Sequence, residues 1–152
     1  MDAQDLLERI RSRYDGLDIL STPDAEYVYY DPARDTAHDK RQPFTTIVLT
    51  DAFDQVSALY REGVYRLNIG VRRDTYRAMF GEPPTWQTTA ELPAKHDLAA
   101  VDVLIPHPIY SPLGWISINA PSEASWPRVR ELLDEAYDQA KRLKRRGHVP
   151  DA

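Results

Sequence analysis

The last part of the chain carries the most regular pattern in the sequence, an apolar stripe with the period of an α-helix. Its members recur at intervals of three or one position, so they share one face of a helix. The pattern predicts a helix over about residues 125–144, with Ser122 or Ser125 able to cap its start. Such a one-sided helix buries its apolar face against another layer. The stripe consists of Trp126, Val129, Leu132, Leu133, Ala136, Tyr137, Ala140 and Leu143.

Upstream of this helix, short β-favouring runs are combined with two short helical segments. Asp2 can cap an amphipathic helix over Leu6–Tyr14, and Asp74 can cap a second helix that ends at Gly81. Residues 82–98 have no apolar period, so we expect a loop. This order predicts an α+β fold: a single, mostly antiparallel sheet of about five to six strands with N-terminal, middle and long C-terminal helices. The predicted strands are Leu17–Leu20, Glu26–Tyr30, Phe44–Leu49, Val64–Ile69, Val101–Ile105 and Trp115–Asn119.

Length and composition are those of an ordinary globular protein. The chain has 152 residues, of which 42% are hydrophobic, enough for one core. We therefore expect a single domain over residues 1–146 and a frayed tail over 147–152. The absence of cysteine excludes a disulfide framework, a thiolate metal site and a cysteine nucleophile. The chain has no apolar run of membrane-spanning length and no signal-peptide pattern at its start, so we expect a cytoplasmic protein without a membrane partner.

A proline-rich segment near residue 110 gathers the most versatile side chains. Three prolines restrict the backbone around His107, Tyr110 and Trp115. An imidazole held beside two aromatic rings can bind a planar or anionic ligand. The alternative is structural: His107 bonds to the backbone while the two rings close the end of the sheet.

Arg66 and Asn68 lie two positions apart on a predicted half-buried strand, so both point away from the core. Together they offer donors that suit a carboxylate or a phosphate. The alternative is a solvated strand face on which Arg66 pairs with a carboxylate. The candidate binding residues for an unknown small molecule or protein partner are therefore His107, Tyr110, Trp115, Arg66 and Asn68.

Patterns for catalysis and metal binding are weaker. His107 can serve as a general acid or base, with Tyr110 or Arg66 as an electrostatic partner. The sequence contains no nucleophile elbow and no glycine-rich phosphate loop. The best local set of metal ligands lies in the polar segment 31–42, which we expect to be a loop, and we predict no metal and no cofactor. That set is Asp35, His38 and Asp39.

Positive charge is concentrated near the end of the chain. Five basic residues within 141–146 can complement the helix dipole or bind a polyanion. The net charge of −5, from 19 basic and 24 acidic residues, disfavours nucleic acid as the main partner. The residues of a nucleic-acid alternative are Arg72, Arg73, Lys141, Arg142, Lys144, Arg145 and Arg146.

Four segments carry a resemblance to a known family. They are Tyr27–Tyr30, Gln42–Val48, Gly63–Gly70 and His107–Trp115. Over about residues 3–145 the chain resembles a small bacterial family, the domain-of-unknown-function family numbered six-one-nine-four. The order of elements more distantly resembles the MmcQ/YjbR-like proteins. That resemblance implies a CyaY-like or double-wing α+β fold, and DNA binding by analogy of fold.

These patterns together predict a small binding or regulatory module without enzymatic activity. Its expected contact surface is the His107–Trp115 loop, with Arg66 and Asn68 nearby. DNA binding through the basic residues is the first alternative, and an enzyme that uses His107 as its general acid or base is the second.

Overall fold

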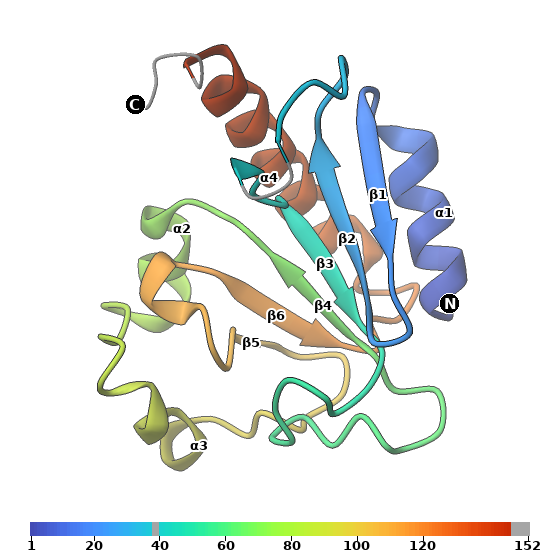
Figure 1. Ribbon diagram of the computed structural model, residues 1–152. Helices are drawn as coiled ribbons and strands as arrows, with labels where there is room; N and C mark the ends of the chain where they lie inside the picture. The colour runs from blue at the N-terminus through green and yellow to red at the C-terminus, as the bar shows by residue number, and fades with distance from the viewer. Residues whose placement is uncertain (38–39, 147–152) are drawn as a thin grey trace.

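The computed structural model describes residues 1–37 and 40–146, which form one six-stranded sheet with helices packed against it (Figure 1). All five strand pairings are antiparallel, in the order β1-β2-β3-β4-β6-β5. The predicted α+β fold with a single antiparallel sheet is therefore confirmed. The strands are β1 (Leu17–Ser21), β2 (Ala25–Tyr30), β3 (Thr45–Val48), β4 (Arg66–Ile69), β5 (Leu104–Pro106) and β6 (Ile116–Asn119).

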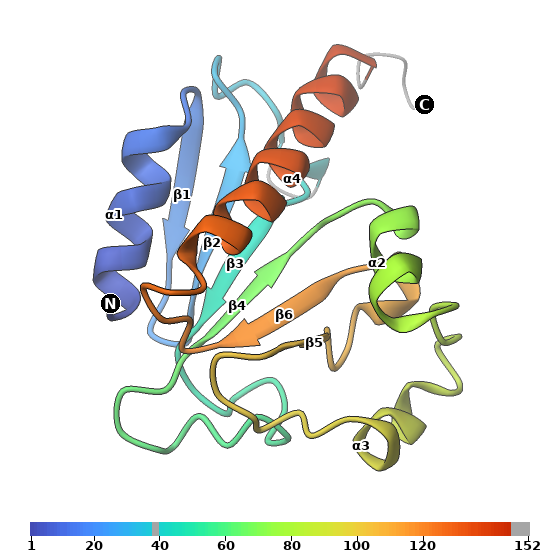
Figure 2. The same cartoon turned by 180° about the vertical axis from the view of Figure 1, so that it is seen from behind.

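Three helices, α1 (Ala3–Arg13), α2 (Arg73–Phe80) and α4 (Trp126–Arg146), lie on the same side of the sheet (Figure 2). The predicted cap of α1 is confirmed, because the Asp2 carboxylate accepts from the Asp5 N–H and the Asp5 carboxylate accepts from the Asp2 N–H. Gly81 ends α2 with φ 83, as predicted.

The predicted capping role of Asp74 is wrong, because α2 begins two residues earlier than a cap at Asp74 would place it. Arg72 occupies the N-cap position and has no side-chain capping bond, while Asp74 lies in the first turn. The Arg72 N–H instead donates to Oε2 of Glu135 on α4, at 2.8 Å. A tertiary contact has therefore taken over the role that a capping side chain usually fills.

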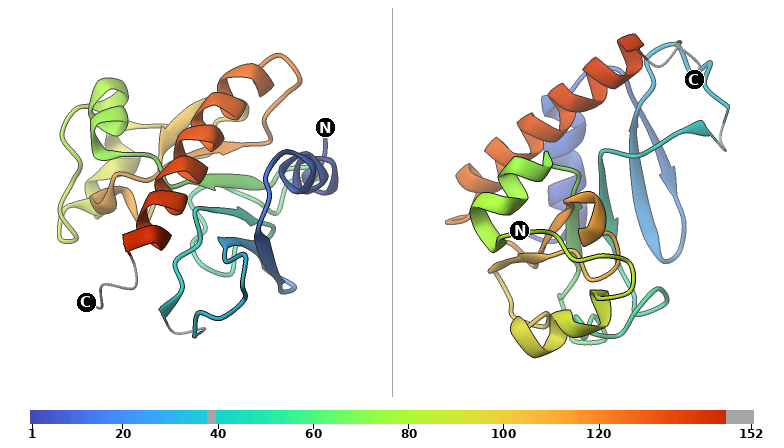
Figure 3. Two further views of the ribbon diagram at one scale, coloured as in Figure 1. Left: turned by 90° about the horizontal axis from the view of Figure 1, so that it is seen from above. Right: turned by 90° about the vertical axis from the view of Figure 1, so that its left-hand side faces the viewer.

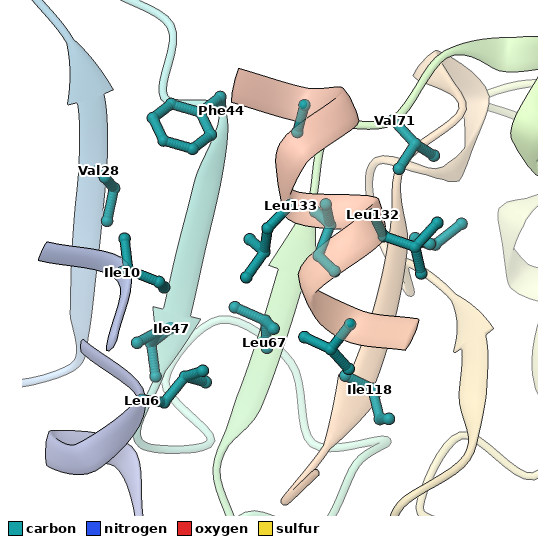
Figure 4. Packing of buried hydrophobic residues seen from close by; sticks show 14 of the residues in the cluster. Leu6, Ile10, Val28, Phe44, Ile47, Leu67, Val71, Ile118, Leu132 and Leu133 are labelled. Atoms are coloured by element: carbon teal, nitrogen blue, oxygen red, sulfur yellow. The ribbon is translucent and has the colours of Figure 1, made fainter. Parts of the chain in front are cut away.

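The apolar faces of α1 and α4 pack on the sheet to form the main core (Figure 4). Leu6 and Ile10 of α1 and Leu133 of α4 have no exposed surface, and the same holds for Leu67 and Ile116 of the central strands. Each such side chain contributes about 1.5–3 kcal/mol through burial. This layer therefore provides most of the driving force for folding and confirms the predicted long helix.

The other face of the sheet is also covered, which corrects the expectation that β4 is half buried. All four residues of β4 are buried. The connection between β3 and β4 folds back over this face and brings Asp54 and Ser57 to Arg66. The connection before β5 does the same for Asn119, whose amide donates to two backbone carbonyl oxygens at 2.9 Å. Alternation along a strand shows which residues share a face, but not what covers that face.

Two segments differ from their predicted extent. The strand expected over 101–105 begins only at Leu104, because Asp102 adopts φ 62, which interrupts an extended run. The loop expected over 82–98 contains a 3₁₀ turn, η2 (Thr89–Glu91), followed by the short helix α3 (Leu92–Lys95) with Pro93 in its first turn.

Of the helices within residues 1–37 and 40–146, none is both long and apolar enough to cross a membrane. The tail predicted to fray, 147–152, lies outside the described residues.

Candidate functional site

A cavity of about 710 Å³ lies between the β2–β3 connection and the C-terminal half of α4. Its volume falls within the range of roughly 300–1,000 Å³ typical of small-molecule sites. Both views in Figure 3 show this connection and the end of α4 on the same side of the molecule. The cavity is therefore built by segments that are more than a hundred positions apart in the chain.

Aromatic side chains make up part of the cavity lining. Tyr29, Tyr30, Phe44 and Trp115 all line it. The indole of Trp115 lies so close to Gly70 that a Cβ atom there would be 2.8 Å from Trp115 Cζ2. A side chain at position 70 would push the indole away, so glycine at this position is what allows Trp115 to form part of the wall.

Charged side chains also line the cavity. The Lys144 ammonium donates to Oδ1 of Asp31 and to Oδ1 of Asp35, both at 3.2 Å, and also bonds the Thr36 hydroxyl. Burial favours a higher pKa for Asp31, but the hydrogen bonds from Lys144 and Thr36 outweigh it, so the pKa is lowered. Asp31 is therefore ionised near neutral pH and ties α4 to the β2–β3 connection.

Asp31 also brings a buried charge close to Arg41. Only 2% of Asp31 is exposed, and its Oδ2 accepts no hydrogen bond from the described residues, although Arg41 Nη1 lies 3.7 Å away. Arg41 bonds Asp18 and lies over the Tyr29 ring at 3.9 Å. The described lining has two acids, Asp31 and Asp35, and three bases, Lys40, Arg41 and Lys144, and the Asp18 partner of Arg41 brings the two charges into balance around the cavity.

His107 is buried and bound to the backbone. Its Nδ1 accepts from the N–H groups of Ile109 and Tyr110, each at 3.0 Å, and only 3% of the residue is exposed. Burial, followed by the positive charge of Arg66, lowers the pKa of His107 well below 6.5, so the ring is neutral near neutral pH. The imidazole therefore holds the turn that leads to Trp115, whose ring centroid is 6.0 Å away.

Arg66 and Asn68 belong to a closed polar network under the β3–β4 connection. Arg66 binds both carboxylate oxygens of Asp54, at 3.1 and 2.9 Å, and its Nε donates to Asn68 at 3.0 Å. Asn68 in turn bonds Thr46 and Ser117, at 2.9 and 2.6 Å. Since Arg66 is 1% exposed and Asn68 is 2% exposed, neither side chain faces the cavity or the solvent.

Tyr110 points to a different surface. It is 48% exposed and its ring lies edge-on to Trp86, at a centroid distance of 6.1 Å. Its ring is also 5.1 Å from His107. The rings of His107, Tyr110 and Trp115 thus lie near one another, as the sequence predicts. Of the five candidate residues, however, only Trp115 lines the cavity.

The basic residues of the nucleic-acid alternative are divided between α2 and α4, and several have acidic partners. Lys144 pairs with Asp31 and Asp35, Arg142 pairs with Asp138 at 3.0 Å, and Arg72 lies 3.8 Å from Glu135. The Lys141 ammonium lies over the Tyr137 ring, and Arg73 donates weakly to the Pro112 carbonyl oxygen, at 3.5 Å. These pairs reduce the positive field that a polyanion would meet. The side chain of Arg146 is outside the described part of the chain.

Within the residues that the structure describes, no three histidine or carboxylate side chains lie close enough to hold a metal ion. Of the metal-ligand set considered from sequence, His38 and Asp39 lie outside the described residues. The remaining member, Asp35, binds Lys144.

Fold and cavity together define a small α+β protein with a ligand-sized cavity between its β2–β3 connection and its last helix. The model of a family of unknown function, DUF6194, matches residues 1–148, so the chain belongs to that family. No curated protein and no solved structure matches the chain.

Sequence patterns missed most of the cavity. Asp31 and Arg41 belong to a polar segment without any period, and Lys144 is part of a basic run at the end of a helix. Their convergence depends on how the β2–β3 connection folds against α4, across 113 positions. The sequence did identify Trp115 as a candidate, and Gly70, whose missing side chain makes room for that indole, lies in a segment that carries the family resemblance.

Proposed function

We propose that this protein is a non-enzymatic binding or regulatory module that holds a small planar molecule between the β2–β3 connection and α4. The observation that carries the proposal is the cavity of about 710 Å³, whose lining combines aromatic side chains with ionised groups. Trp115 links this cavity to the contact loop expected from the sequence. The contact surface proposed here is therefore the Trp115 end of that loop, rather than the whole loop.

The nature of the walls indicates the class of ligand. The aromatic character of the lining, to which Tyr29, Phe44 and Trp115 contribute, favours a flat, partly apolar molecule. Because the acids Asp31 and Asp35 are offset by Lys144 and Arg41, a strongly charged ligand would gain little. A neutral or singly charged aromatic compound fits these conditions best.

The environment of His107 supports a role without catalysis. A general acid or base has to reach its substrate and change protonation near the working pH. His107 is buried, accepts two backbone hydrogen bonds and has a lowered pKa. Its contribution is to hold the chain before Trp115.

Nucleic-acid binding through Arg72, Arg73 and the end of α4 is a weaker proposal, because Lys144 and Arg142 already have acidic partners. The distant likeness to MmcQ/YjbR-like proteins, the bacterial source and the cytoplasmic location all stay predictions.

Filling the cavity tests the proposal. Ala140 and Leu143 line it from α4, so the substitutions Ala140→Phe and Leu143→Trp place bulk inside it and at its rim. Ala78→Phe, on the exposed side of α2, is the control for adding a ring elsewhere. Saturation-transfer NMR would measure binding of three planar probes of one size, namely benzamidine, benzamide and benzoate.

We expect the wild-type protein and Ala78→Phe to bind at least one probe, and both cavity variants to lose that binding. The proposal is wrong if the wild-type protein binds none of the three probes. It is also wrong if binding persists in Ala140→Phe and Leu143→Trp, because the probe would then occupy another surface.

A further inference from the structure

An open depression of about 590 Å³ lies between α1 and α4, away from the cavity described above. The two helices lie side by side on the sheet (Figure 2). Every side chain that lines the depression carries a hydrogen-bond donor, and three of them are permanently cationic. The lining residues are Arg9, Ser12, Arg13, Trp126 and Arg130.

Helical spacing explains why these residues converge. Arg9 and Arg13 are one turn apart on α1, and Trp126 and Arg130 are one turn apart on α4, so each pair shares one helix face. The Arg9 guanidinium carbon lies 5.2 Å from the centroid of the Trp126 ring. This cation–π contact joins the two helices at the depression.

Carboxylates orient two of the arginines from outside the depression. Arg9 Nη2 lies 2.5 Å from Glu123 Oε2, and Arg13 binds both oxygens of Asp134 at 2.8 Å. Neither carboxylate lines the depression. Since a guanidinium has five N–H groups, both arginines keep donors for a further acceptor.

Arg130 makes no ion pair within the described residues. Its charge acts on Asp134 only through space, as a smaller contribution after the hydrogen bond from Arg13 to the lowered pKa of that carboxyl. Three cations against two carboxylates leave an excess of one positive charge at the depression. An anion bound there would give Arg130 the partner that its neighbours already have.

We propose that this depression binds a phosphoryl group, with Arg130, Arg13 and the Ser12 hydroxyl as its donors. Planar guanidinium forks match the oxygens of a phosphate better than single ammonium groups do. The Trp126 ring flanks the same space and suits a ligand whose phosphate is attached to a flat group. This site is independent of the proposed cavity ligand. A phosphate monoester and the backbone of a nucleic acid offer the same chemistry, and the test has to separate them.

The test compares Arg130→Gln with Arg128→Gln. Both changes remove one positive charge from the same helix, but Arg128 pairs with Glu131 at 3.5 Å and does not line the depression. Chemical shifts of the arginine Nε–H and tryptophan indole groups would follow titrations with inorganic phosphate, adenosine monophosphate and a twelve-nucleotide single strand in a low-salt buffer. A salt titration of each complex would complete the set.

We expect inorganic phosphate to bind the wild-type protein, Arg130→Gln to weaken it about tenfold, and Arg128→Gln to change it less than twofold. A monoester that binds as tightly as the single strand assigns the site to small phosphorylated ligands. A single strand that binds far more tightly, with a steep loss of affinity as salt rises, assigns it to nucleic acid. Equal losses in both variants, or no shift with inorganic phosphate at millimolar concentration, would overturn the proposal.

Discussion

Two clusters of buried acid and base use the same residue types in different ways. Under the β3–β4 connection, Arg66 binds both oxygens of Asp54 and further bonds Asn68 and Ser57. At the β2–β3 connection, Asp31 is equally buried, yet its Oδ2 accepts no hydrogen bond within the described part of the chain and the residue borders the cavity. The first cluster, around Arg66, is saturated with hydrogen bonds and structural, and we call it the closed cluster. The second, around Asp31, borders a cavity, and we call it the open cluster.

This difference shows what makes a polar cluster available to a ligand. Buried charges normally require complete sets of hydrogen bonds, and the Arg66 network uses strand neighbours to provide them. The Asp31 cluster depends on the long β2–β3 connection and on the last turns of α4. We expect the closed cluster to matter most for stability and the open cluster to matter most for binding.

The largest expected effect comes from breaking the closed cluster. Replacing Arg66 by methionine leaves the Asp54 carboxylate, whose side chain is 14% exposed, without its main partner. Removing one member of a buried ion pair costs about 3–5 kcal/mol. Urea unfolding at pH 7, followed by circular dichroism, would measure the loss.

Arg77→Met is the matched control for that measurement. Arg77 pairs with Asp74 and Glu82 on the exposed side of α2, and its side chain is 43% exposed. We expect a change of about 0.5 kcal/mol or less. Similar losses in both variants would mean that the Arg66 network contributes no more to the free energy of unfolding than an exposed ion pair does.

The next effect concerns the wall of the cavity. In Gly70→Ala the new Cβ would meet Trp115 Cζ2 at 2.8 Å and the Phe44 carbonyl oxygen at 3.2 Å. We expect a loss of about 1–3 kcal/mol, typical of overpacking. In a double-mutant cycle with Trp115→Leu, the cost of the alanine should fall. An unchanged cost would show that the indole is not the obstacle.

The sequence predicted the fold well where periodicity is strong. The stripe from Trp126 to Leu143 lies within α4, and the six predicted strands correspond to β1–β6. It failed where backbone conformation or distant contacts decide the outcome. Asp102 shortens β5 through its positive φ, and Glu135 fixes the start of α2 from another helix.

The candidate site was less predictable than the fold. Strand alternation correctly placed Arg66 and Asn68 on one face of β4. The burial of that face depends on Asp54 and Ser57, which lie in the β3–β4 connection, where the sequence has no hydrophobic periodicity. It also grouped Lys144 with a basic run, although its contacts are with Asp31 and Asp35. Residue type and spacing identified candidates, and only tertiary folding separated the closed cluster from the open one.

A smaller effect, confined to acid pH, should come from His107, which lies beside the closed cluster. Its lowered pKa means that the unfolded chain takes up a proton below pH about 6.5 while the native chain does not. The native state therefore loses stability as the pH falls through this window, by on the order of 1 kcal/mol between pH 7.5 and 5.5. In His107→Asn, whose side-chain oxygen can still accept the backbone N–H groups, this contribution is absent.

Urea unfolding at pH 7.5, 6.5 and 5.5 would compare the two proteins. We expect their stabilities to converge toward low pH, since the carboxylates titrate alike in both. Parallel curves would show that His107 takes up its proton equally in the native and unfolded states.

The smallest effect is expected at the open cluster. Lys144→Met removes the ammonium that bonds Asp31, Asp35 and Thr36, and its side chain is 20% exposed. We expect a loss of about 1 kcal/mol at pH 7. Because the folded pKa of Asp31 is lowered, this contribution is present above pH about 3.9 and disappears as the pH falls further.

Arg142→Met, which breaks only the exposed pair with Asp138, should change stability by less than half as much. A loss at Lys144 as large as that at Arg66 would contradict the contrast between the two clusters, because both would then be structural.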